Sequence, residues 1–251
     1  MNNEIVHLEL QRYDAISLEE MDAVKLMNRT DTKYLMRLEA ATQLLRQLRN
    51  ECRMLVVEGE CWGRYRSQYY DTSDLQMFYS HITGRYPRFK VRERHYSQND
   101  LSFFEIKRKS NGGRTSKKRL PACPENQTSI EALLYSLTPF DFASLKCVLI
   151  SHFNRVTLVN KAKTERITLD FNLSFNSAAC EQHTLSFPQI AVLEVKQNRR
   201  CESFVSGLLH QSGFRPTGMS KYCVGMFLVN RMETYKRYKP NLHEFLKLQY
   251  A

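Results

Sequence analysis

Basic residues alternate with apolar ones along several stretches of the sequence. Lys90, Arg92 and Arg94 occupy every second position, with Val91 between the first two. Because successive side chains of a β-strand point to opposite faces, the three cations would share one face and Val91 would lie on the other. The same alternation places these charged residues on one face of their own strands: Asp31, Lys33, Glu105, Lys107, Lys109, Lys117, Arg119, Asp170, Glu194 and Lys196.

A face so rich in Arg and Lys would repel itself unless an anion neutralised it. Guanidinium and ammonium groups match phosphate oxygens, so a phosphate chain is the anion that suits it. The few carboxylates on this face, Asp31, Glu105, Asp170 and Glu194, are suitable ligands for Mg²⁺ or Mn²⁺. The alternative is an antiparallel sheet with one solvated face. The predominance of one sign of charge favours a phosphate-binding face that could support phosphoryl transfer.

The composition agrees with a polyanionic partner and excludes several classes of protein. The 251 residues include 37 Lys and Arg against 26 Asp and Glu, a net charge of +11. No apolar run approaches the ~20 residues of a membrane span, and the first residues lack the pattern of a signal peptide. Seven scattered cysteines without a C-x-x-C pair favour reduced thiols in a cytoplasmic protein over disulfides or zinc.

Motifs for other kinds of catalysis are missing from the sequence. It has no P-loop, no G-x-G-x-x-G turn and no G-x-S-x-G nucleophile context. The seven histidines are scattered without ligand spacing, so each is interpreted as a surface or core residue. Tyr65, Tyr69 and Tyr70 could stack a base, but core packing is the more common use of such tyrosines.

The elements that must position the charges follow from the hydropathy pattern. It predicts strands over residues 29–37, 54–57, 64–70, 88–96, 101–109, 114–120, 152–159, 165–171 and 190–196, and helices over 18–26, 38–48, 75–82, 129–137, 140–149, 202–211, 221–232 and 242–248. Strands with interspersed helices and short turns predict an α+β fold whose antiparallel sheet curls or closes. If the charged face turns inward, the result is a basic tunnel with helices outside.

Nine short motifs resemble the VTC domain, in the order in which that family has them. This is the catalytic domain of the vacuolar transporter chaperone polyphosphate polymerases, within the triphosphate tunnel metalloenzyme superfamily. The resemblance spans roughly residues 9–230. The motifs are Arg29–Tyr34, Ser67–Thr72, Lys90–Tyr96, Phe103–Lys107, Gly113–Arg119, Phe153–Arg155, Leu169–Asp170, Leu193–Lys196 and Ser220–Tyr222.

The resemblance implies an eight-stranded antiparallel β-barrel that transfers the γ-phosphate of ATP to a growing inorganic polyphosphate chain with Mn²⁺ or Mg²⁺. It implies catalytic roles for Lys33, Arg92, Arg94, Lys107 and Arg155, and substrate binding by Arg29, Lys90, Lys117, Arg119, Lys196, Ser220 and Lys221. Glu194 would hold the metal, with Glu105 and Asp170 as further candidates.

One departure from the wider superfamily narrows the expected activity. Related hydrolases and cyclases typically open with an E-x-E-x-K strand, whereas Arg29, Asp31 and Lys33 stand at the corresponding positions here. The basic residue weakens a triphosphate hydrolase reading and favours the polymerase branch. That hydrolase and a non-catalytic polyanion-binding module remain the alternatives.

A single VTC-like tunnel domain is expected over residues 1–251, with a core at about 9–230 and a C-terminal helical extension at 231–251. The expected partners are ATP and inorganic polyphosphate, and no nucleic acid, because RNA binders usually interleave exposed aromatic residues with basic ones. No membrane span and no inositol-phosphate-sensing domain is recognised, so any membrane protein that receives the product would be a separate partner.

Overall fold

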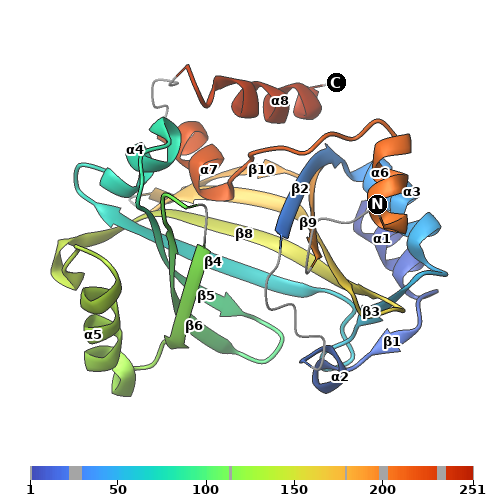
Figure 1. The fold of residues 1–251 in the computed structure, drawn as a ribbon, viewed down its shortest axis with the longest axis horizontal. Helices are drawn as coiled ribbons and strands as arrows, with labels where there is room; N and C mark the ends of the chain where they lie inside the picture. The colour runs from blue at the N-terminus through green and yellow to red at the C-terminus, as the bar shows by residue number, and fades with distance from the viewer. Residues whose placement is uncertain are drawn as a thin grey trace.

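The fold is built on one antiparallel sheet whose longest path has eight strands. The structure is a computed structural model, and it describes residues 2–22, 30–112, 115–178, 180–197, 203–230 and 236–250. Figure 1 shows the sheet as the centre of the molecule, with helices around it. This arrangement confirms the predicted α+β fold. In spatial order the strands are β2 (Thr30–Arg37), β11 (Ile190–Gln197), β9 (Glu165–Ser177), β8 (Leu145–Asn160), β4 (Gly63–Thr72), β5 (Arg88–Tyr96), β6 (Leu101–Lys109) and β7 (Thr115–Pro121).

The sheet is curled rather than fully closed. No backbone pairing joins β2 to β7 within the part of the chain that the structure describes. Strands from the two halves of the strand order nevertheless lie near each other. Burial lowers the pKa of Lys90 on β5, and the charge of Lys33 on β2 lowers it further. Since charges act at such strength only over short distances, the curl of the sheet brings β2 near β5 across a common interior.

Helices cover the outer face of the sheet, where the apolar residues of each strand point. α3 (Leu38–Leu48) packs Leu44 and Leu45 against Leu169 and Leu193, together with α1 (Asn2–Leu10) and α6 (Phe204–Gln211). On the other side of the molecule, α5 (Gln127–Leu137) covers Val91 and Ile106. The outward direction of Val91 and Ile106 is the one that the alternation predicts.

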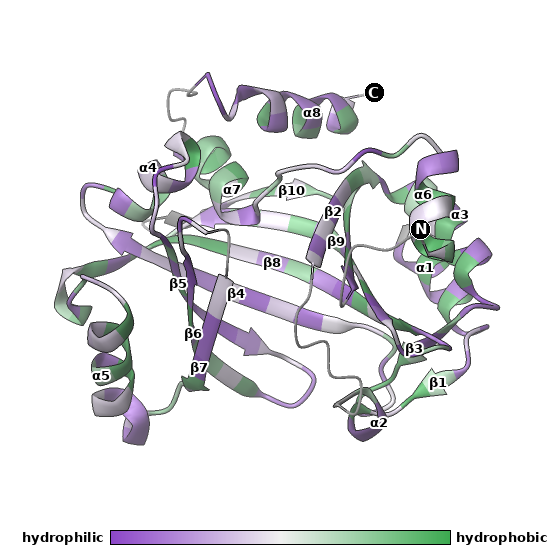
Figure 2. Cartoon of the chain, viewed as in Figure 1, coloured by the Kyte–Doolittle hydropathy of each residue, from purple (hydrophilic) through white to green (hydrophobic). Residues whose placement is uncertain are grey.

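The inner face is only partly charged, because a helix fills one half of it. α7 (Lys221–Val229) is largely hydrophobic (Figure 2), as expected of a buried helix. It packs on Leu149 and Phe175, and a Cβ added at Gly225 would lie 2.6 Å from Leu149. Glycine at this position therefore permits the close approach. α4 (Gln76–Thr83) and α8 (Lys239–Tyr250) complete this apolar half.

Several predicted boundaries differ from the structure. The predicted helix over residues 140–149 is wrong, since its second half begins the long strand β8 after the 3-10 turn η2 (Phe142–Ser144). A short apolar run such as Cys147–Ile150 fits a buried strand as well as a helix, and cross-strand pairing decides between them. The hydropathy pattern did not predict α1, β1 (Ala15–Ile16) or β10 (Cys180–Phe187). The strand predicted over 54–57 corresponds to β3 (Cys52–Leu55), and the helix predicted over 18–26 corresponds to α2 (Leu18–Asp22).

None of the described helices is both long and apolar enough to cross a membrane. Five of the described cysteines are free thiols that form no disulfide, namely Cys52, Cys61, Cys123, Cys147 and Cys223. Arg29, Gly113 and Arg114, which belong to the recognised motifs, lie outside the described residues.

Candidate functional site

A cluster of cations lies on the inner face of strands β5, β6 and β7. Lys90 is paired with Lys107 across β5 and β6, and Lys107 is paired with Lys117 across β6 and β7. One register step further, Arg92, Glu105 and Arg119 form the next row. Since residues two apart on a strand share a face, both rows point the same way. The sheet thus brings together charges that are far apart in the sequence.

Glu105 is the fully buried carboxylate at the centre of this cluster, with 0% of its surface exposed. It accepts two hydrogen bonds on Oε2 from Arg92, at 2.7 Å from Nε and 2.5 Å from Nη2. Lys117 donates to its other oxygen. Burial alone would raise the pKa of Glu105, but the neighbouring cations hold it well below its usual range. Glu105 therefore stays ionised and fixes the Arg92 guanidinium.

Lys107 has no hydrogen bond or ion pair with any described residue, although it lies inside the cluster. Burial, together with the charge of Arg92, lowers the pKa of Lys107 to about 6. Glu194, from the opposite end of the strand order, acts in the other direction and favours the charged ammonium. With this pKa, Lys107 is mostly a neutral amine at neutral pH in the free protein, and an anion bound beside it would raise the pKa and restore the ammonium.

Arg94 is the second cation of the cluster that no described carboxylate pairs. Only 6% of its surface is exposed. Its Nε donates to Ser67 Oγ at 3.1 Å, and its guanidinium lies 5.4 Å from the Tyr65 ring and 5.7 Å from the Phe153 ring. The two rings stack on each other, and the guanidinium lies beside both, where cation–π attraction helps to hold it while leaving donors available. Arg94 is thus arranged to bind a ligand oxygen.

Arg155, Asp170 and Lys221 form a separate triad at the border with α7. Arg155 donates to both oxygens of Asp170, at 2.5 Å from Nε and 2.7 Å from Nη2, and Lys221 donates to Oδ2 as well. The two cations hold the pKa of Asp170 well below its usual range, against the effect of its burial. The bidentate geometry orients the Arg155 guanidinium toward the interior.

Of the candidate metal ligands Glu105, Asp170 and Glu194, Glu194 accepts the fewest hydrogen bonds. Its Oε2 accepts from Lys196 Nζ at 2.5 Å, whereas its Oε1 lies 4.0 Å from Lys33 Nζ. Its side chain is 16% exposed. Burial would raise its pKa, but Lys196 and Lys33 hold it well below the usual range, so it is a carboxylate at neutral pH.

These contacts decide which carboxylates suit a divalent metal. No group of three potential ligands from His, Cys, Asp and Glu gathers anywhere in the described ranges. Both oxygens of Glu105 and both of Asp170 accept hydrogen bonds from cations. Glu194 Oε1 has no hydrogen bond. Mg²⁺ is commonly held by one or two carboxylates plus substrate phosphates, and of these three candidates Glu194 is the one with an oxygen that accepts no hydrogen bond.

The N-terminus of α7 closes the charged half of the interior. Ser220 is the N-cap residue, and its Oγ accepts from the Cys223 backbone N–H at 3.4 Å. The same Oγ accepts from Lys90 Nζ at 2.9 Å. The predicted residues Ser220, Lys221 and Lys90 therefore lie together at the start of α7, next to the cationic rows.

Two further predicted residues lie at the margins of the cluster. Arg119 is exposed on β7, and its guanidinium lies 4.6 Å from the Phe103 ring. Lys196 is engaged by Glu194 and lies 3.4 Å from Thr168 Oγ1. Arg29 lies outside the described residues.

Sequence reasoning missed the buried group that anchors α7. Asp71 is 0% exposed and accepts hydrogen bonds from the backbone N–H groups of Thr72, Met77 and Phe78 at 2.8–2.9 Å. It also accepts from Tyr222 Oη on α7 at 2.5 Å. Asp71 thereby ties the start of α4 to the residue next to Lys221. An Asp four residues before a predicted helix could have suggested a cap, but not its tertiary partner.

Replacing Asp71 with Ala is expected to lower the free energy of unfolding by about 3 kcal/mol or more, because it leaves several buried donors without acceptors. Urea unfolding of the variant measures the loss. Asp74→Ala is the matched control, since Asp74 is exposed before the same helix, interacts with its near neighbours Thr72 and Gln76, and should cost much less stability. Equal stability of the two variants would contradict the anchoring role.

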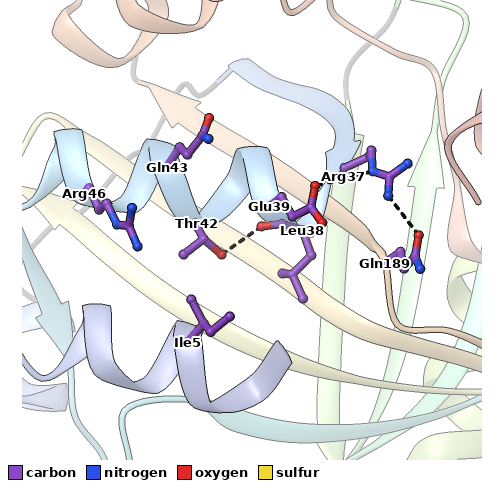
Figure 3. Close-up of a pocket in the computed structure, with 8 residues that line it drawn as sticks. All are labelled: Ile5, Arg37, Leu38, Glu39, Thr42, Gln43, Arg46 and Gln189. Carbon is purple, nitrogen blue, oxygen red and sulfur yellow. Dashed lines mark hydrogen bonds and ion pairs between the residues drawn. The ribbon is translucent and has the colours of Figure 1, made fainter. Parts of the chain in front are cut away.

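A cavity lies elsewhere, away from these charged residues. It has a volume of about 260 Å³ and opens on the outer side of the sheet, between α1 and α3. Figure 3 shows Arg37 and Arg46 at its rim; Arg37 donates to Gln189 Oε1 at 3.1 Å, and Arg46 pairs with Glu9 at 2.8 Å. Its arginines already have partners, and it is not continuous with the charged inner face.

Comparison with solved structures gives distant likenesses of fold. A putative adenylate cyclase from Vibrio parahaemolyticus is 13% identical with a TM-score of 0.46, over 76% of this chain and 94% of that one. A putative adenylyl cyclase from Hippeastrum with a dominant triphosphatase activity is 16% identical with a TM-score of 0.48, over 81% and 97%. A Pyrococcus horikoshii protein is 9% identical with a TM-score of 0.47, over 80% and 99%.

Comparison with protein families gives a direct assignment, although no curated protein matches the chain. A sequence model of the VTC domain matches residues 28–230. This range contains all the strands of the eight-strand path, the cationic rows and the N-terminus of α7. The chain therefore belongs to the VTC domain family.

Proposed function

We propose that the chain is a polyphosphate polymerase, which transfers the γ-phosphate of ATP to the end of an inorganic polyphosphate chain. The observation that carries the proposal is the buried basic face, on which Arg94 and Lys107 form no hydrogen bond or ion pair with any described carboxylate, beside the ionised Glu194. The positive charge of such a face is not balanced by the protein's own carboxylates, and a bound polyanion would balance it. We also propose that it acts in the cytoplasm, where ATP is supplied and its thiols stay reduced.

The proposed chemistry needs charge neutralisation more than proton transfer. A terminal oxygen of the growing chain attacks the γ-phosphorus, a new P–O bond forms, and the bond to the β-phosphate oxygen breaks to release ADP. Since a terminal phosphate is largely ionised near neutral pH, its oxygen attacks without a general base. Lys33, Arg92, Arg94, Lys107 and Arg155 would stabilise the charge that spreads over the transferred group.

The remaining predicted residues would hold the rest of the phosphate chain, namely Lys90, Lys117, Arg119, Lys196, Ser220 and Lys221, with Arg29. Glu105 and Asp170 would position Arg92 and Arg155 rather than bind metal, because cations occupy their oxygens. Glu194 would hold Mg²⁺ or Mn²⁺, which when bound supplies further positive charge to the phosphate oxygens.

One incubation separates the proposed activity from its alternatives. Purified protein with ATP and Mn²⁺ is expected to produce long polyphosphate, resolved on a gel from free phosphate. Free phosphate as the sole product would mean a triphosphate hydrolase. Binding of polyphosphate without turnover of ATP would mean a non-catalytic module.

No single histidine is expected to be essential. His95 and His152 are both in register with Arg66, on the face opposite the cationic rows. His81 on α4 contacts the Phe89 carbonyl at 2.9 Å, and its burial lowers its pKa to about 2, so it stays neutral. Single changes of these three to Gln should alter the rate of polyphosphate formation by less than about tenfold. A hundredfold loss in a folded variant would reveal a proton-transfer step.

A further inference from the structure

The segment that follows the family match returns to the charged interior. Arg237 donates from Nη1 to the Thr83 carbonyl at 3.0 Å, where α4 ends. The next residue, Tyr238, is 7% exposed, and its ring stacks on Phe227 of α7 with centroids 5.4 Å apart. α8 then lies across the apolar half of the fold (Figure 1), with Leu242 and Phe245 buried. The match ends at residue 230, so this contact is a feature of the chain beyond it.

The Tyr238 hydroxyl contacts both backbone polar groups of Ser220. It accepts a hydrogen bond from the Ser220 backbone N–H at 3.1 Å, and it lies 3.5 Å from the Ser220 carbonyl oxygen. Ser220 is held in an extended conformation, with φ −132° and ψ 121°, as an N-cap residue must be. The tyrosine therefore fixes the direction in which the Ser220 side chain points.

The direction of Ser220 matters because of Lys90. Ser220 Oγ is the one hydrogen-bond partner that the described structure gives the Lys90 ammonium, at 2.9 Å. Lys90 lies in register with Lys107 and near Lys33, so the surrounding charges repel it. A long lysine side chain also loses considerable rotamer entropy when it is ordered. Without a fixed acceptor, its ammonium would move away from the cationic rows.

We propose that Tyr238 is a positioning residue for the polyanion site: its hydroxyl fixes Ser220, and Ser220 in turn holds the Lys90 ammonium at the face where phosphates bind. The proposal rests on the proposed function in so far as the ligand is a chain of phosphates. It gives the C-terminal segment a role in the site besides covering the core.

Tyr238→Phe is the decisive variant, because it removes the hydroxyl and keeps the ring that stacks on Phe227. Calorimetric titration with inorganic tripolyphosphate is expected to show an affinity about three- to tenfold lower, the effect of losing one hydrogen bond. Tyr13→Phe is the matched control. Tyr13 is also buried and donates to the Leu45 carbonyl, but it lies in the outer core. Its loss should leave the affinity unchanged.

Ser220→Ala tests the route of the effect. If Tyr238 acts through Ser220, Tyr238→Phe should have no further effect on affinity in a Ser220→Ala background. An undiminished effect there, or an equal loss in Tyr13→Phe, would overturn the proposal.

Amine labelling of the free protein provides a readout without any ligand. Limiting acetic anhydride, followed by mass spectrometry, is expected to modify Lys90 at a rate at least about twofold different in Tyr238→Phe and unchanged in Tyr13→Phe. Unchanged labelling of Lys90 in Tyr238→Phe would refute the positioning role. Failure of the wild-type protein to bind tripolyphosphate would instead refute the proposed function, and the labelling would still decide the role of Tyr238.

Discussion

Replacing Arg94 with Ala is expected to slow polyphosphate formation by about 10²–10³-fold, the scale for removing one preorganised electrostatic group. Arg94 is chosen because it is buried beside the stacked rings of Tyr65 and Phe153, and because no described carboxylate forms an ion pair with it. Its loss therefore removes charge from the phosphates and leaves no buried carboxylate unpaired. The steady-state rate from ATP, measured on a variant with unchanged circular dichroism, tests the prediction.

Two further variants serve as controls for Arg94→Ala. Arg94→Lys keeps the charge but loses the planar guanidinium, so it should recover only part of the rate. Arg108→Ala removes an exposed arginine from the opposite face of β6 and should leave the rate unchanged. If Arg94→Ala retains more than about a tenth of the rate, Arg94 does not stabilise the transferred phosphate.

The charged face could be predicted from the sequence because strand alternation is a local property. Arg92 and Arg94 share a face whatever the strand packs against, and Val91 must then turn to the other side. The structure has this arrangement, with Val91 in the outer core under α5. The motifs around these residues identified the family, and the family match covers the same range.

The pairing of the charges could not be predicted in the same way. Glu105 meets Lys117 because of the register of β6 with β7, and register depends on the turn between the strands and on what the sheet packs against. The resemblance implied Glu194 as the metal ligand, but the residue types alone left Glu105 and Asp170 as further candidates. The register and the contacts separate them, since they surround Glu105 and Asp170 with cations and leave Glu194 with one oxygen that has no hydrogen bond.

The position of α7 also depends on distant residues. Its sequence is hydrophobic on all sides, which predicts burial but not a place inside the sheet. That place requires Gly225 for close contact with Leu149, and Asp71 to accept from Tyr222. Such contacts join residues more than 70 positions apart and leave no local pattern in the sequence.

Replacing Glu194 with Gln is expected to lower turnover by about 10²-fold or more while the fold is retained. The amide keeps the shape of the side chain but lacks the negative charge that would hold Mg²⁺ or Mn²⁺ against the phosphates. The metal concentration needed for half-maximal rate should rise as well. Titration of the rate with Mn²⁺ at fixed ATP measures both effects.

The other two carboxylates provide the contrast that makes the Glu194 test specific. Glu105→Gln and Asp170→Asn would disturb Arg92 and Arg155, so they should lower the rate or the stability without raising the half-saturating metal concentration. Glu39→Gln, at an exposed position on α3, should change neither quantity. Full activity of Glu194→Gln at low metal would exclude Glu194 as the main ligand. A shift in metal requirement with Glu105→Gln instead would mean that substrate binding releases Glu105 from Arg92 and Lys117 to become the ligand.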